Sequence, residues 1–413
     1  MLPCRDEGEP DVTLDTQLVW ILDKQTMANG TSATPPSPNS GDSPFARRGS
    51  PRRKAVPGDT RRHNRSLVLR TIFRSGPVSR ADLARSTHLT RAATSELAAE
   101  LLSEGLVEEL GTRPDQGVGK PATLLGLVPD ARFTVTLDLS DDARFRAALV
   151  DLGGKVLERR MAERDGRRSD AALDLAIELC VDLAAAAADA DRPLLGVGVG
   201  SPGVVDPAGI VLEAPNLGWH GLELSARLAR ALVVPVAVHV ANDANAAALG
   251  ELGLGGPAER SLLLVKIGHG VGAGLVLDGH LVVGDRFAAG EIGHVVVDPD
   301  GEVCACGRTG CLETAASAPR LRRGDKGERD AGGRRLGEAL APVVSALNLR
   351  EIVLSGPLDV LDESFRAAAL DAIRERTMPA VGDNVDIRLS SLGEDDVLLG
   401  AAMLVLDREL GVA

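Results

Sequence analysis

The sequence predicts an α/β protein in which a small helical domain with a β-hairpin precedes a larger body of two lobes. Between residues 61 and 128, apolar residues recur with a helical period in three segments and then form two short apolar runs around a Gly- and Pro-rich tip. From residue 132 onward, predicted strands and helices alternate, as in α/β folds. A strand–turn–strand–turn–strand pattern occurs twice there, at residues 133–156 and 261–283, which indicates two related lobes.

Length and composition exclude several classes of protein. The chain has 413 residues, which favours two or three domains, and its hydrophobic content of 44% is sufficient for a large core. Every apolar run stops short of the roughly 18 residues that a transmembrane helix needs. The apolar run 18–22 is too short for a signal peptide, and acidic residues precede it. We therefore expect a cytoplasmic protein with no membrane partner, in a compartment where free thiols persist.

The N-terminal part of the chain differs in composition from the rest. Residues 1–60 are predicted to be disordered, because the segment 28–59 is rich in Pro, Ser, Gly and Thr and cannot bury enough apolar surface. Met27 is a second candidate start. From residue 46 to residue 132, 16 Lys and Arg oppose 9 Asp and Glu, so this stretch carries +7 although the whole chain carries −13. The excess indicates an anionic partner, although a solvated charged face would show it too.

Residues 61–130 read as a winged helix-turn-helix domain. A first helix is predicted over residues 64–75 and stops at Gly76-Pro77. Ser79 can cap a short helix, and Thr90 can cap a longer one that ends at Gly105. Residues 106–110 and 122–128 then form a hairpin around the tip 111–121.

In such a domain the third helix enters the major groove and the wing contacts the DNA backbone. The start of the third helix offers Arg91, Thr94 and Ser95 on the face predicted to be exposed, and Arg113 and Lys120 on the wing can meet phosphates. A three-helix module that binds protein is the alternative. The local positive charge favours DNA.

A cysteine cluster predicts a metal site. The stretch EIGHVVVDPDGEVCACGRTGC has the spacing H-x9-C-x-C-x4-C, and Gly307 and Gly310 permit tight turns around an ion. Three thiolates and one imidazole are a common closed ligand set for zinc, which would be structural because no position is left open. An oxidised or coincidental cluster is the alternative, but a Cys-x-Cys pair is poorly placed to bridge itself. The candidate ligands are His294, Cys304, Cys306 and Cys311.

The duplicated strand pattern is how actin-like ATPases hold a nucleotide between two lobes. In the second copy, glycines alternate as in a loop whose backbone amides cradle phosphate, although glycines also make tight hairpins. In the first copy, Asp138, Ser140, Asp141 and Asp142 stand where a phosphate loop needs amide groups, so carboxylates would face a phosphate. The candidate phosphate-loop residues are Gly268, Gly270, Gly272 and Gly274.

With these motifs, the chain resembles the ROK family of repressors, open reading frames and sugar kinases over residues 61–410. The resemblance is specific at GVGVGSPGVVD (196–206), PNLGW (215–219), VANDANAAALGE (240–251) and the segment 291–313. It implies an actin-like (ribonuclease H-like) two-lobed sugar-kinase fold preceded by the winged helix-turn-helix. The added DNA-binding domain places the chain with the family's transcriptional regulators.

The resemblance also implies a sugar site. Asp243 matches the residue that acts as general base in the family's kinases, whereas a helix cap is the alternative role for this side chain. His294 would bind zinc through one ring nitrogen and the sugar through the other, so that the metal sets the orientation of the ring. The implied sugar-binding residues are Asn216, Asn242, Asp243, Glu291, His294 and Glu313.

The departures from the family pattern concern the nucleotide. Of the kinases' first phosphate motif (Asp, small apolar, Gly, Gly, Thr) only Asp138 and Leu139 remain, and residues 354–357 replace a Gly-rich adenosine motif. These changes argue against ATP and Mg²⁺ as cofactors and against enzymatic activity, while the sugar side is intact.

We therefore interpret the chain as three parts: a disordered segment (1–60), a winged helix-turn-helix domain (61–130) and a ligand-binding body (131–413) with a zinc loop at 294–311. The expected function is a sugar-responsive transcriptional regulator, a repressor, that binds operator DNA and a sugar or sugar phosphate as a homodimer or homotetramer. An ATP-dependent, glucokinase-like sugar kinase with a DNA-binding head is the first alternative. A co-regulator that binds another protein and no sugar is the second.

Overall fold

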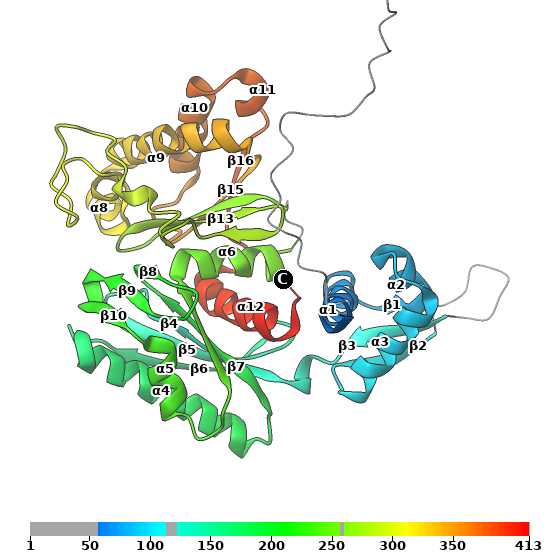
Figure 1. The fold of residues 1–413 in the computed structure, drawn as a ribbon. Coiled ribbons are helices and arrows are strands. Elements are labelled where there is room, and N and C mark those ends of the chain that lie inside the picture. The colour runs from blue at the N-terminus through cyan, green and yellow to red at the C-terminus, as the bar shows by residue number, and fades with distance from the viewer. Residues whose placement is uncertain (1–56, 113–121, 257–259, 413) are drawn as a thin grey trace, which may run out of the picture. The chain divides into compact units, whose positions relative to one another are not determined.

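The computed structural model describes residues 57–112, 122–256 and 260–412 (Figure 1). Nearly all of the segment predicted to be disordered lies outside these residues. The exception is its end, because helix α1 (Pro57–Ser75) begins at Pro57 and not at Asn64 as expected. No helix within the described ranges is long and apolar enough to cross a membrane.

The N-terminal domain, here called the head, has the predicted order of helices and strands. The Ser79 side chain accepts a hydrogen bond from the amide of Asp82, and Thr90 accepts one from the amide of Ala93, so both predicted caps are confirmed. The three helices and the antiparallel three-stranded sheet contribute to one apolar core, and the winged helix-turn-helix assignment stays a prediction. Besides α1, the head contains β1 (Val78–Ser79), α2 (Arg80–Thr87), α3 (Arg91–Ser103), β2 (Val107–Thr112) and β3 (Thr123–Leu127), with the strands in the antiparallel order β1-β3-β2.

Two five-stranded sheets of the same topology form the body. In each sheet three consecutive strands are antiparallel, and two later strands add in parallel beside the first of them. This duplication confirms the predicted two-lobed, actin-like fold. The first sheet has the order β11-β7-β4-β5-β6, with β4 (Phe133–Asp138), β5 (Arg144–Asp151), β6 (Val156–Glu163), β7 (Leu194–Ser201) and β11 (Ala237–Asn242). The second has the order β14-β13-β12-β15-β16, with β12 (Leu262–Ile267), β13 (Val271–Leu277), β14 (His280–Val282), β15 (Glu351–Ser355) and β16 (Asp386–Leu389).

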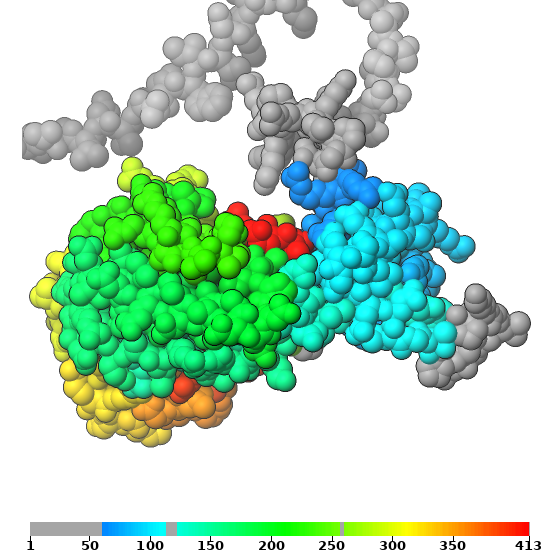
Figure 2. Space-filling model, turned by 90° about the horizontal axis from the view of Figure 1, so that it is seen from below, coloured from blue at the N-terminus to red at the C-terminus, as the bar shows by residue number. Residues whose placement is uncertain are grey.

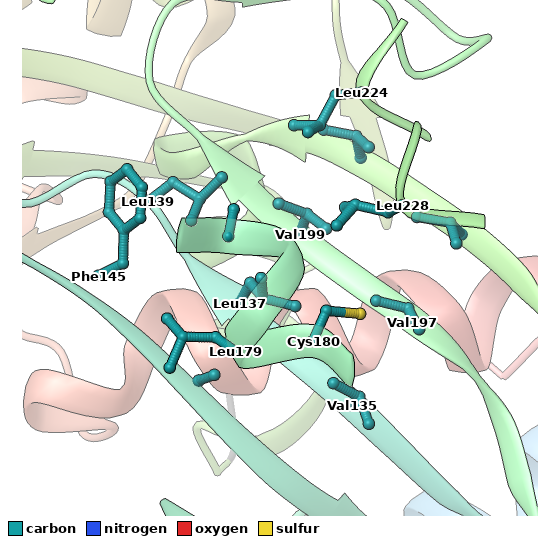
Figure 3. Packing of buried hydrophobic residues seen from close by; sticks show 14 of the residues in the cluster. Val135, Leu137, Leu139, Phe145, Leu179, Cys180, Val197, Val199, Leu224 and Leu228 are labelled. Carbon is teal, nitrogen blue, oxygen red and sulfur yellow. The ribbon is translucent and has the colours of Figure 1, made fainter. Parts of the chain in front are cut away.

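Helices cover both sheets. α4 (Ser169–Asp189) and α5 (Leu224–Ala231) pack on one face of the first sheet, where leucines and valines form a core (Figure 3). α6 (Asp243–Leu254) contacts both sheets, and α12 (Asp396–Leu410) packs beside it on the first sheet (Figure 1). The remaining elements are η1 (Pro129–Ala131), β8 (Val204–Val205), β9 (Val211–Ala214), η2 (Pro215–Leu217), β10 (Trp219–Leu222), η3 (Ile292–His294), α7 (Leu312–Ala316), α8 (Ala318–Arg323), α9 (Lys326–Leu347), α10 (Glu363–Arg376), α11 (Pro379–Gly382) and η4 (Gly393–Asp395).

Strand β7 shows how the sequence encodes this layering. Side chains alternate between the two faces of a strand, so the valines and glycines of GVGVG (196–200) point to opposite faces. Val197 and Val199 join the core with α4 and α5 (Figure 3). On the other face, a Cβ at Gly198 would lie 2.1 Å from the carbonyl oxygen of Ala401 in α12. The glycines therefore let α12 lie directly on the sheet, against α6, whose first turn carries candidate site residues.

Candidate functional site

The four predicted metal ligands converge around η3 and the following loop. The ligand atoms of His294, Cys304, Cys306 and Cys311 all lie within 4.8 Å of one another. The Sγ atoms of Cys306 and Cys311 are 3.6 Å apart, and Sγ of Cys304 lies 3.6 Å from Nδ1 of His294. Zinc bound in a tetrahedron at about 2.3 Å from each sulfur requires sulfur–sulfur distances of about 3.8 Å. The four side chains therefore fit a closed, tetrahedral metal site.

The protonation of the thiols and the loop geometry agree with this fit. All three are free thiols, which argues against the oxidised alternative. Burial raises the pKa of Cys304 to about 12, so the thiol stays protonated until a cation stabilises the thiolate. Gly310 has φ of 72°, and a Cβ there would lie 1.4 Å from the carbonyl oxygen of Asp298. The tight turn predicted at this glycine is confirmed.

Beside the three cysteines lie three implied sugar-binding carboxylates and the imidazole of His294, and we call Asp243, Glu291, His294 and Glu313 the sugar-side group. Nε2 of His294 lies 4.0 Å from Oε2 of Glu291, on the ring edge away from Cys304. Oε2 of Glu313 accepts a hydrogen bond of 3.2 Å from the amide of Val271. The side chains of Glu291 and His294 remain 40% and 37% exposed. The group can therefore accept hydrogen bonds from the hydroxyls of a ligand.

The pKa values of two carboxyl groups in the sugar-side group are raised by burial and by neighbouring charges. Burial raises the pKa of Glu291, and the carboxylates of Asp243 and Glu313 raise it further, against the opposing effect of His294. Burial also raises the pKa of Asp243, which starts α6. Carboxyl groups whose pKa is raised by burial and by neighbouring carboxylates are more frequent at functional sites than elsewhere.

The two asparagines behave differently from this group. Asn242 is the N-cap of α6: its Oδ1 accepts from the amide of Asn245, and its Nδ2 donates to the carbonyl of Gly203. The capping role that was the alternative for Asp243 therefore belongs to Asn242, and the Asp243 carboxylate is not the cap. Asn216 is exposed on η2, and within the described residues its side chain forms no hydrogen bond with the sugar-side group.

Two of the three carboxylates at the end of β4 and in the turn after it, Asp138 and Asp142, have partners that can carry positive charge, whereas Asp141 accepts a hydrogen bond from the amide of Ala143. We call Asp138, Ser140, Asp142, Arg146 and Lys266 the phosphate-side group. Both oxygens of Asp138 are engaged: Oδ1 accepts from the amide and hydroxyl of Ser140, and Oδ2 accepts from Arg146. Asp142 pairs with Arg164 at 3.3 Å and with His269 of the second lobe at 3.0 Å. The reason is tertiary, because strand β5 and the second lobe supply the cations.

The glycines of the candidate phosphate loop serve packing. A Cβ at Gly270 would lie 2.5 Å from Oε2 of Glu313, and one at Gly274 would lie 2.4 Å from the carbonyl oxygen of Ala244 in α6. The amide of Gly268 donates to the carbonyl of Gly270. At Gly272, in contrast, the nearest atom would be 3.6 Å away. Close approach of α6 and Glu313 thus accounts for two of the four glycines without a phosphate.

The residues expected to contact DNA divide into three sets. Arg91 and Ser95 are exposed in the first turns of α3. Thr94 is 0% exposed, so its expected place on the DNA-facing side was wrong; it lies on the face of α3 that packs into the head. Arg113 and Lys120 lie outside the described residues.

Part of the positive charge of the head is neutralised internally. Arg61 of α1 pairs with Glu96 and Glu100 of α3, and Arg65 pairs with Glu104. The exposed first turn of α3 precedes these glutamates. Each pair joins one positive to one negative charge, so the net excess of the stretch is unchanged while Arg61 and Arg65 already have partners within the head.

Three charged residues of the site were missed by the sequence analysis. Lys266 interrupts the apolar run of β12, and its Nζ lies 3.2 Å from Oγ of Ser140 and 3.7 Å from Oδ2 of Asp243. Arg146 in β5 holds Asp138. Asp396 starts α12, is buried, and accepts a hydrogen bond from Ser355. The single lysine inside a buried strand was the available signal.

Known proteins resemble this chain either over much of its body or over most of its length. The model of the ROK family matches residues 141–331. The xylose repressor of Caldicellulosiruptor bescii is 28% identical over 383 residues, which are 83% of this chain and 95% of that protein. The glucokinase of Halalkalibacterium halodurans is 32% identical over 257 residues, which are 52% of this chain and 77% of that protein.

Among solved structures, a ROK family transcriptional regulator described as a homologue of Escherichia coli Mlc superposes with a TM-score of 0.73 at 26% identity. The match covers 86% of this chain and 98% of that chain. The repressor and regulator matches thus include the head, whereas the glucokinase match is about as long as the body alone.

Proposed function

Because the chain belongs to the ROK family, we propose that it is a sugar-responsive, DNA-binding transcriptional regulator, a repressor, whose kinase-like body holds the sugar. One observation carries the proposal. The chain joins a winged helix-turn-helix head to a body in which the sugar-side carboxylates converge and the phosphate-side carboxylates are neutralised by the chain's own cations. A kinase needs the sugar side and an open phosphate side, whereas a regulator needs only the sugar side.

The sugar-side group supplies the binding chemistry. Ionised carboxylates accept strong hydrogen bonds from hydroxyls, and Asp243, Glu291 and Glu313 present several acceptors close together. The neighbouring imidazole of His294 can donate through Nε2 when Nδ1 binds a metal. The most informative first ligands are D-xylose and D-glucose, in view of the xylose repressor and glucokinase among the relatives.

We propose that the ion held by His294 and the three cysteines is zinc. The distances between the thiols and the imidazole support a tetrahedral ion, and four protein ligands leave no position for a substrate. When bound, zinc holds the loop closed and fixes the ring of His294. These four residues would then set the orientation of the sugar-side group without taking part in any reaction.

Sugar binding can reach the head through α6 and α12. The first turn of α6 carries Asp243, α6 packs along α12, and the C-terminal end of α12 shares an apolar core with α1. Arg70 of α1 also donates a hydrogen bond of 3.1 Å to the carbonyl oxygen of Gly411. Figure 2 shows this C-terminal end, in red, at the surface between the blue α1 and the green body. A ligand shifts the head only as far as it binds one arrangement better than another.

The experiment that tests the proposal combines DNA and sugar. Duplexes selected from a random library by the purified protein give its operator, and a palindromic operator supports a homodimer. Fluorescence anisotropy then measures operator affinity with and without each sugar of a panel, and thermal shift identifies sugars that bind the folded protein. The proposal predicts one sugar that raises the melting temperature and also changes operator affinity. If no duplex is enriched, the DNA-binding function is wrong.

The kinase alternative is tested in the same preparation. A coupled assay with ATP, Mg²⁺ and the binding sugar is expected to show no turnover, because Lys266 and Arg146 occupy the surroundings of Asp138. Turnover near 1 s⁻¹, the lower range for kinases, would replace the regulator by a kinase with a DNA-binding head.

A further inference from the structure

Lys266 occupies an unusual position for a lysine. Its neighbours in β12 are apolar and buried, and its own side chain is only 17% exposed. Its Nζ contacts Ser140 in the first lobe at 3.2 Å and Asp243 at the start of α6 at 3.7 Å. The ammonium therefore connects the two lobes at the point where the sugar-side and phosphate-side groups meet.

The surroundings of this ammonium are acidic. A buried ammonium is costly unless it is paired, and here the carboxylates of Asp243, Asp396 and Asp138 all stabilise it. Burial alone would lower the pKa of Lys266, but these three carboxylates raise it. Conversely, burial alone would raise the pKa of Asp138, but Lys266, Arg146 and Ser140 lower it. Lys266 thus stays charged and keeps Asp138 ionised.

We propose that Lys266 is the built-in counter-ion of the ligand site: it takes the place of a divalent cation, and the carboxylates that still outnumber it exclude a phosphorylated sugar, so that the site takes an uncharged sugar. This inference rests on the proposed function, because it assumes that Asp243 faces a sugar hydroxyl.

Exclusion of a phosphorylated sugar follows from the balance of charges. Three carboxylates, Asp138, Asp243 and Asp396, already share the positive charge of Lys266. In addition, Glu291 lies close enough to Asp243 and to Glu313 to be repelled by both. A phosphate beside Asp243 would add negative charge to a partly buried site in which carboxylates outnumber cations. At contact distance and moderate dielectric, one such repulsion weakens binding by about 100-fold or more.

Exclusion of a divalent cation follows from the same ammonium. Oδ1 of Asp138 accepts from Ser140 and Oδ2 accepts from Arg146, and Nζ of Lys266 lies 3.7 Å from Oδ2 of Asp243. A divalent cation would have to displace an ammonium that the protein cannot release. Removal of the ammonium leaves carboxylates without their cation, which is the oxygen-rich environment that Mg²⁺ and Mn²⁺ prefer.

The test compares the wild type with Lys266→Met, which keeps the length of the side chain, and with Lys266→Arg, which keeps the charge. Calorimetry with D-glucose, D-glucose 6-phosphate, N-acetylglucosamine and its 6-phosphate, together with D-xylose, gives the selectivity of the wild type. Titration with Mn²⁺, followed by electron paramagnetic resonance on zinc-loaded protein, gives cation binding.

The proposal predicts that the wild type binds a neutral sugar about 100-fold more tightly than any of the phosphates. It also predicts that Lys266→Met binds Mn²⁺ at least about 10-fold more tightly than the wild type, because an acidic site has lost its internal cation, whereas Lys266→Arg does not. A wild type that prefers a 6-phosphate, or equal Mn²⁺ affinity in the wild type and Lys266→Met, would overturn it. The wild-type selectivity decides the matter even if Lys266→Met fails to fold. A wild type that binds no sugar of the panel contradicts the proposed function instead, and the Mn²⁺ comparison then still tests the role of Lys266.

Discussion

The sugar-side and phosphate-side groups lie next to each other but neutralise their carboxylates in different ways. Among the described residues, no Lys or Arg pairs with Glu291 or Glu313, and their oxygens meet an imidazole, a thiol and a backbone amide. On the phosphate side, Asp138 and Asp142 each meet at least one cationic side chain of the protein. One group is therefore free to bind hydroxyls, and the other is internally satisfied.

This difference teaches how a kinase-like body can lose catalysis and keep recognition. Phosphoryl transfer depends on loops and cations that position the phosphates, whereas sugar binding depends on hydrogen-bond acceptors. Here the chain's own cations pair with Asp138 and Asp142, whereas Glu291 and Glu313 contact no Lys or Arg among the described residues. The two groups consist of separate residues, so each can be altered without the other.

The largest effect is expected from the metal loop that supports the sugar side. Cys306 is exposed, so Cys306→Ser costs little packing but removes one of four metal ligands. We expect the variant to lose its zinc and to melt about 5 °C lower or more, because metal binding contributes directly to folding. Mass spectrometry measures the zinc content, and scanning calorimetry measures the melting temperature. Cys180→Ala is the matched control, since Cys180 is buried in α4 outside the loop and its loss should leave zinc unchanged. Zinc retained by Cys306→Ser would contradict the ligand assignment.

A second test concerns the phosphate side. Asp138→Asn leaves Arg146 and Lys266 without their buried partner, which is expected to cost about 3–5 kcal/mol of unfolding free energy. The lowered pKa of Asp138 fixes the sign of the pH dependence. Its ionisation stabilises the fold above the ordinary value of 3.8, and this contribution disappears as the pH falls through the lower folded value. Denaturant unfolding should therefore show that the difference in unfolding free energy between the wild type and the variant is constant above pH 3.8 and shrinks below it. A difference that grows on acidification would show that Asp138 is not stabilised as a carboxylate.

A third test acts on the sugar side and should cost the fold less than Asp138→Asn, because Lys266 keeps Asp138 and Asp396. Asp243→Asn removes a charged acceptor, and a hydrogen bond to a charged group is worth about 1.5–3 kcal/mol, so sugar affinity should fall by about 10- to 150-fold. Operator affinity without sugar should not change. Calorimetry and anisotropy measure the two, with Asp359→Asn, a surface residue paired with Arg322, as the control. Unchanged sugar affinity would remove Asp243 from the sugar side.

The head provides a test that should be independent of both groups. Arg91 is exposed in the first turn of α3, and no described residue forms an ion pair with it. If it reads a base, Arg91→Ala costs about 1–3 kcal/mol of operator binding and relaxes specificity at one position. Arg322→Ala, on the body, should leave operator binding unchanged. Equal operator binding by Arg91→Ala and the wild type would exclude Arg91 from the DNA surface.

The smallest effects distinguish packing from phosphate binding in the glycine loop. Gly274→Ala places a methyl group 2.4 Å from a backbone oxygen of α6, and such overpacking costs about 1–3 kcal/mol. Gly272→Ala meets its nearest atom at 3.6 Å and should change the free energy of unfolding by less than about 1 kcal/mol. A loop that cradles phosphate would instead make both variants equally stable and equally deficient in nucleotide binding. Unfolding in urea separates these outcomes.

Local patterns predicted most of the elements and the composition of the site. The caps at Ser79 and Thr90 and the turn at Gly310 were predicted correctly because each depends on a few consecutive residues. The start of α1 was missed, because Pro57 is well suited to the first turn of a helix but was counted with the segment predicted to be disordered.

The sequence by itself determined the duplicated lobes, the helices and hairpin of the head and the His/Cys cluster, because periodicity, caps and residue spacing are properties of neighbouring residues. Only the tertiary structure decided that Thr94 is buried, that Asn242 and not Asp243 is the cap of α6, and that Asp138 and Asp142 are paired. The partners of Asp138 come from β5 and from Lys266 of the other lobe. Such contacts depend on which elements the fold places side by side, and charge balance between distant residues leaves no periodic signal in the chain.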